Sequence, residues 1–101
     1  MSDPLLEEVG VSSDLFERQV ALRRALHKSP ELSWKETQTA DRIEQALTEL
    51  GIPSRRLEGT GVVADLPGTG AEGPWVALRA DTDALPIAEE TGLGFASEVP
   101  G

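Results

Sequence analysis

The sequence predicts an α/β fold in which two helices precede a β-hairpin and a buried strand. Apolar side chains recur at helical spacing in the first half of the chain, whereas short valine-containing runs bounded by glycine and proline follow Gly51. The 101 residues have the length of one small domain, and 39% of them are hydrophobic, as is ordinary for a globular protein. We expect this fold over residues 13–101, preceded by a disordered or frayed lead-in over residues 1–12.

The first helix is predicted over residues 14–28. Asp14 and Glu17 have the spacing of a capping box, and leucines recur on one face of the segment. Pro30 ends the helix, because the residue before a proline is pushed out of the helical region.

The second helix is predicted over residues 34–50. Ser33 and Glu36 form a second potential capping box, and apolar residues follow at helical spacing. Gly51 suits the left-handed conformation that ends many helices, and Pro53 follows.

Strands are predicted in the second half of the chain. Residues 54–58 read as an edge strand, 59–61 as a turn and 62–66 as an alternating strand. Residues 75–80 form a nearly continuous apolar run, typical of a strand covered on both faces. A loop is expected over residues 81–86.

Composition excludes several classes of protein. The formal net charge is −9, which disfavours nucleic-acid binding because a phosphate backbone needs a basic partner surface. The first residues have no signal-peptide pattern and no segment is apolar enough to cross a membrane, so we expect a cytoplasmic protein without membrane partners. The chain has no cysteine and one histidine, which excludes a structural zinc site made by this chain alone.

Asp81 and Asp83 are the best candidates for chemistry, because they directly follow the predicted buried strand. Ligands gather beyond the carboxyl ends of strands in open α/β sheets, and an extended backbone would place both carboxylates on one side. Their mutual repulsion would be relieved by a nearby divalent cation. The alternative is a loop in which aspartate caps a turn, and two carboxylates are too few to enclose a cation.

Three other features have structural interpretations that we prefer. His27 could be a general base or metal ligand, but its place at a helix end favours a structural role. Residues 68–73 match the glycine pattern of dinucleotide-binding loops, yet a predicted strand follows where a helix would have to open, so we predict a turn. Trp34 and Trp75 are expected to pack in a core or interface.

Five segments together carry a family resemblance. They are RALHKSPELS (24–33) followed by Glu36, GTGVVA (59–64), ALRADTDALPI (77–87), ETGL (90–93) and FAS (95–97). In this order, over about residues 16–101, the chain resembles the N-terminal portion of metal-dependent amidohydrolases related to hippurate hydrolase, N-acyl-amino-acid deacylases and indole-acetyl-amino-acid hydrolases.

The resemblance implies the opening part of a mixed-sheet metallo-hydrolase catalytic domain. It also implies two divalent ions (Zn, Mn or Co) in the complete enzyme, whose bridging water attacks the amide carbonyl of a small N-acyl amino acid. Homo-oligomerisation is left open. By position, Asp81 resembles the site of a metal-binding histidine in the related carboxypeptidase branch, and Asp83 resembles the aspartate that orients that histidine.

The metal ligands of the family are expected beyond Gly101, in a His-x-Cys-Gly-His-Asp stretch. We therefore expect no metal to be held by this chain alone and no amide hydrolysis by the isolated chain. The alternative is a non-catalytic acidic interaction module that retains the fold segment.

Overall fold

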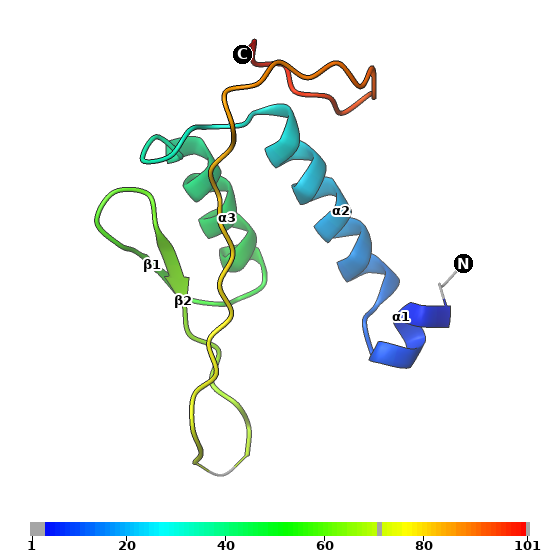
Figure 1. Ribbon diagram of the computed structural model, residues 1–101. Coiled ribbons are helices and arrows are strands. Elements are labelled where there is room, and N and C mark those ends of the chain that lie inside the picture. The colour runs from blue at the N-terminus through cyan, green and yellow to red at the C-terminus, as the bar shows by residue number, and fades with distance from the viewer. Residues whose placement is uncertain (1–3, 71, 101) are drawn as a thin grey trace. The chain divides into compact units, whose positions relative to one another are not determined.

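The computed structural model describes residues 4–70 and 72–100 (Figure 1). Within these ranges the chain forms three helices and a two-stranded antiparallel sheet, which confirms the α/β class. The chain divides into two compact units, one of residues 1–30 with 87–101 and one of residues 31–86. No helix in the described ranges is long and apolar enough to span a membrane.

Helix α1 (Pro4–Val9) was not predicted, because the sequence indicated a disordered or frayed lead-in over residues 1–12. Proline suits the first position of a helix, where a backbone N–H would have no partner. Gly10, at φ 75°, ends the helix, and the Val11 amide donates to the Leu6 carbonyl at 2.9 Å. Residues 1–3, also part of the predicted lead-in, lie outside the described residues.

Helix α2 (Ser13–Lys28) agrees with the prediction to within one residue, but its start is stabilised differently. The Ser12 hydroxyl accepts a hydrogen bond from the Leu15 amide at 3.1 Å, as an N-cap serine does. The predicted capping box of Asp14 and Glu17 is therefore wrong. Asp14 instead forms an exposed ion pair with Arg18 at 3.4 Å.

Helix α3 (Thr37–Glu49) ends as predicted but begins three residues later than expected. At its C-terminus Gly51 has φ 74°, and the Ile52 amide donates to the Leu47 carbonyl at 2.9 Å. This is the hydrogen-bond pattern of a helix closed by a left-handed glycine.

The N-terminus of α3 is capped by Glu31, not by the predicted box of Ser33 and Glu36. The Glu31 carboxylate accepts hydrogen bonds from the amides of Gln38 and Thr39, at 3.2 and 2.6 Å, and from the Thr39 hydroxyl at 2.7 Å. The helix cannot start earlier because residues 32–35 form a turn closed by a 2.9 Å hydrogen bond, in which Trp34 has φ 66°. A carboxylate suits this end of a helix, where the amides are unpaired and the dipole is positive.

Strands β1 (Ser54–Arg56) and β2 (Val62–Ala64) form the predicted hairpin. Arg55 lies opposite Val63, and the intervening turn contains Gly59 at φ 85°. Helix α3 packs against both strands. Ala40 on α3 is the one buried apolar residue in the described part of the chain, with 1% of its surface exposed.

Arg56 joins β1 to α3 through two ion pairs. Its guanidinium lies 2.7 Å from the Asp41 carboxylate and 2.5 Å from that of Glu44. These ion pairs connect the hairpin to the helix in addition to the packing of α3 against both strands.

The predicted buried strand over residues 75–80 is wrong, because these residues form neither a strand nor buried surface. The segment has no regular structure (Figure 1), and the exposed fractions of Val76 and Leu78 are 85% and 98%. A strand requires a hydrogen-bonded neighbour, and within the described residues β1 and β2 pair only with each other. The apolar side chains of this segment favour burial, but in the described structure they are exposed.

The Glu31 cap gives the first prediction. Burial raises the pKa of Glu31, but hydrogen bonds from the Thr39 side chain and from the amides of Thr39 and Gln38 outweigh it, so the net pKa is lowered from its ordinary 4.5. A pKa lowered by folding means that the stabilisation is present above the unfolded value and is lost as the pH falls through the folded value. Glu31→Gln should therefore lower the free energy of unfolding by about 1–2 kcal/mol at pH 7 and reduce its dependence on pH below 5.

Urea denaturation followed by circular dichroism at pH 7 and at lower pH measures both effects. The matched control is Glu49→Gln at the other end of α3, where the dipole does not favour a carboxylate, so no loss of stability is expected. Equal effects of the two substitutions would contradict the assigned cap.

Candidate functional site

Asp81 and Asp83 line an open hollow of about 400 Å³ in the unit of residues 31–86. Three segments that are distant in sequence surround it. The lining residues are Ser33, Trp34, Glu36, Thr60, Gly61, Arg79, Ala80, Asp81, Thr82 and Asp83.

Hydrogen bonds connect the loop that contains Asp81 and Asp83 to the turn that precedes α3. The Thr82 hydroxyl donates to the Glu36 carboxylate at 3.1 Å across 46 residues of sequence, and the Ala84 amide donates to the Glu31 carbonyl at 2.9 Å. Glu36 is 8% exposed and also accepts from the Lys35 amide at 3.0 Å. These contacts hold the loop at Thr82, between the two aspartates, and at Ala84, directly after them.

The carboxylates of Asp81 and Asp83 remain exposed. Asp81 pairs with Arg79 at 2.7 Å, but the side chains of this pair are 67% and 84% exposed, so the pair contributes little to stability. Their exposure leaves both aspartates accessible to a ligand or to another polypeptide.

The donor set of the hollow does not fit a two-metal centre. Its carboxylates come from Asp81, Asp83 and Glu36, and Glu36 already accepts from Thr82 and Lys35. Across residues 4–70 and 72–100, no group of three or more His, Cys, Asp or Glu side chains could hold a metal ion.

His27 has structural partners in the unit of residues 1–30 and 87–101. Its Nε2 lies 2.5 Å from the Glu89 carboxylate, and its ring meets Phe95 edge-on at 6.0 Å between centroids. Hydrogen bonds from the Thr91 hydroxyl and the Ser97 amide, opposed by burial and aided by His27, lower the pKa of Glu89. The structure thus brings His27 to a carboxylate that fixes the C-terminal segment, in keeping with the preferred structural interpretation.

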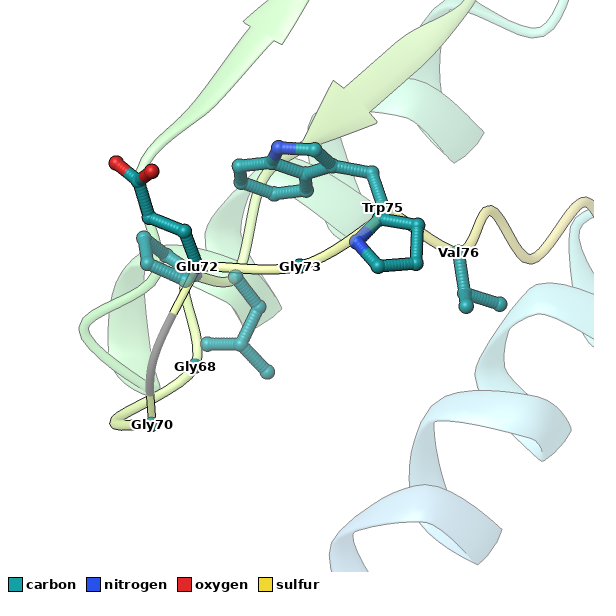
Figure 2. Close-up of a pocket in the computed structure, with 9 residues that line it drawn as sticks. Gly68, Gly70, Glu72, Gly73, Trp75 and Val76 are labelled. Carbon is teal, nitrogen blue, oxygen red and sulfur yellow. The ribbon is translucent and has the colours of Figure 1, made fainter.

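The glycine-rich segment lines a separate hollow of about 650 Å³ within residues 66–76 (Figure 2). No described residue of this segment is helical, so no helix N-terminus is available there for a phosphate group. Figure 2 shows Trp75 and Val76 pointing to opposite sides of an extended backbone. The prediction of a turn rather than a dinucleotide site agrees with this geometry.

The two tryptophans are exposed, so the predicted packing in a core is wrong, whereas the alternative of packing in an interface stays a prediction. Trp34 is 81% exposed and Trp75 is 72% exposed. Sequence reasoning also missed Glu36 as a residue of the hollow, because its spacing from Ser33 indicated a helix cap. The family segments that contain Glu36 and Thr82 were a signal that could have placed these residues together.

Comparisons with known proteins agree with the resemblance. No protein-family profile matches the chain. The chain is 48% identical over 87 residues to the putative amidohydrolase YhaA of Bacillus subtilis (strain 168), which covers 85% of this chain and 22% of that protein. It is 49% identical over 90 residues to the N-acetyl-L-cysteine deacetylase of the same organism, with coverages of 88% and 21%.

A solved structure shows the same relationship. The crystal structure of Bacillus subtilis YXEP protein, a dinuclear metal binding peptidase from the M20 family, matches with a TM-score of 0.82 at 43% identity. The match covers 89% of this chain and 26% of the YXEP chain.

The class defined by these similarities is that of the metal-dependent amidohydrolases, as the sequence predicted. Within that class, the chain is homologous to part of the M20-family enzymes. It spans about a fifth of the length of the curated relatives that it matches.

The hydrogen bond from Thr82 to Glu36 gives the second prediction. Thr82→Val keeps the shape of the side chain but removes the donor to a buried carboxylate, so the free energy of unfolding should fall by about 1–3 kcal/mol. Thr60→Val, in the same hollow, is the matched control and should change it little, because no hydrogen bond involves the Thr60 side chain in the described structure. Urea denaturation of both variants makes the comparison, and indistinguishable midpoints would argue against the tie.

Proposed function

We propose that this chain is the N-terminal segment of a metal-dependent amidohydrolase that cleaves the amide bond of N-acyl amino acids. One observation carries the proposal: three of the five segments that resemble the family meet at one hollow. Glu36, the Thr60–Gly61 turn and the loop of Asp81 to Asp83 all line it. The name of one relative, an N-acetyl-L-cysteine deacetylase, supports a small N-acylated amino acid as the substrate class.

In this proposal, the chain contributes shape and orientation to the catalytic domain. Asp83 orients a metal-ligating side chain supplied by another part of the enzyme, and Asp81 lies beside it as a further positioning carboxylate. Thr82 and Glu36 hold the loop that carries both. When bound to the complete enzyme, the divalent ions would activate water and polarise the amide carbonyl.

A non-catalytic acidic interaction module is the second candidate. The observation that favours it is the exposed apolar segment over residues 75–80, which offers an unpaired backbone and apolar side chains to a partner. Such a module would need neither aspartate for catalysis.

A chimeric enzyme tests the proposed function. In it, this chain replaces the matching segment of the Bacillus subtilis N-acetyl-L-cysteine deacetylase, with which it shares 49% identity over 90 residues. We expect the chimera to release acetate from N-acetylcysteine in the presence of a divalent metal salt, and to lose this activity with a chelator. Asp83→Asn in the chimera should lower kcat/KM by about 10- to 100-fold, as expected for a residue that orients a metal ligand.

The matched control is Asp65→Asn, at an exposed aspartate paired with Arg55 outside the hollow, which should leave the kinetics unchanged. A folded chimera without activity, or one in which both substitutions have the same effect, would favour the interaction module. We expect the isolated 101-residue chain to show no turnover with the same metals, and turnover by it would show that the chain supplies a complete catalytic centre.

A further inference from the structure

The Glu89 carboxylate collects three hydrogen-bond donors within the unit of residues 1–30 and 87–101. It accepts from His27 Nε2 at 2.5 Å, from the Ser97 amide at 3.1 Å and from the Thr91 hydroxyl. A carboxylate only accepts hydrogen bonds, so Nε2 of the His27 ring carries a proton in this arrangement. The Glu89 side chain is 13% exposed, and these donors hold its charged form.

A second set of contacts joins the same segment to the end of α2. The Glu98 amide donates to the Lys28 carbonyl at 2.9 Å, one of the carbonyls that the C-terminus of a helix leaves without a partner. The guanidinium carbon of Arg24 lies 4.5 Å from the centre of the Phe95 ring, which also meets the His27 ring edge-on. Figure 1 shows the segment beside the C-terminal end of α2.

Residues 89–98 thus form a strap across the last turns of α2, and little apolar burial supports this strap. Among the described residues of its unit, 4–30 and 87–100, no side chain is buried. An open hollow of about 330 Å³ remains beside the strap, lined by Gln19, Val20, Arg23, Arg24 and Phe95. A segment with few buried apolar contacts opens locally at a lower free-energy cost than a core element does.

We propose that the strap docks on α2 and releases from it as one unit, with the Glu89 carboxylate as the latch. Loss of the latch removes the acceptor of the Ser97 amide, and the strap then leaves α2, so the Glu98 amide loses its partner as well. The strap contains the family segments of residues 90–93 and 95–97, which do not line the hollow of the candidate site. This device involves no ligand and is independent of the proposed function.

Amide hydrogen exchange of the ¹⁵N-labelled 101-residue chain, measured by nuclear magnetic resonance at pH 7, tests the latch in Glu89→Gln. Glutamine keeps the size of the side chain but removes the charge, and hydrogen bonds to a charged group are about twice as strong as neutral ones. We expect the amides of Ser97 and Glu98 to exchange about tenfold faster, while the Ala40 amide in α3 keeps its rate. The matched control is Glu90→Gln, at the neighbouring exposed glutamate, which should change none of these rates.

His27→Phe tests whether the strap opens as one unit. This variant removes the donor that α2 offers to Glu89 but keeps an aromatic ring beside Phe95. In the described structure, the Ser97 amide donates to Glu89 and the Glu98 amide to Lys28, so neither amide depends directly on the His27 ring. We expect both amides to exchange faster by a similar factor in His27→Phe, because opening the latch releases the whole strap.

Three outcomes would overturn the proposal. Faster exchange at Ser97 without a change at Glu98 would show that the contacts open separately. Equal rates in Glu89→Gln and Glu90→Gln would show that the Glu89 charge is not the latch. Faster exchange at Ala40 together with the strap amides, in both Glu89→Gln and His27→Phe, would show a general loss of structure instead of release of the strap.

Discussion

The hydrogen bonds from the first turn of α3 to the Glu31 carboxylate are the interaction on which the unit of residues 31–86 depends. They pair amides that a helix of this kind leaves without partners, and they fix the direction in which the chain enters the helix. The same residue accepts the Ala84 amide through its backbone carbonyl. One residue therefore holds both the start of α3 and the loop that carries the candidate site.

Polar contacts have this importance because the apolar core is small. In the described residues Ala40 is the one buried hydrophobic residue, while Glu36 and Thr39 are buried polar residues with hydrogen-bond partners. Arg56 adds ion pairs between the hairpin and α3. Where so little apolar surface is buried, the geometry of the hollow is specified mainly by directional hydrogen bonds, which tolerate little displacement.

The exposed apolar segment and the incomplete donor set are consistent with the limited span of the chain. Residues 75–80 have the composition of a buried strand without a neighbour, and the hollow has carboxylates without imidazole or thiolate partners. The chain matches about a fifth of the length of its curated relatives. The apolar segment would need a neighbouring strand to be buried, and the carboxylates of the hollow would need further donor groups to hold a metal ion.

The sequence by itself determined helices α2 and α3, the hairpin, the left-handed Gly51 and the family resemblance, because these follow from periodicity, turn residues and short motifs. It did not determine the cap by Glu31 or the tie from Thr82 to Glu36, since each joins residues whose spacing fits no local pattern. It also predicted a buried strand over residues 75–80, which are exposed and form no strand. Composition states which side chains favour burial, but only the tertiary structure decides whether a neighbour is present to bury them.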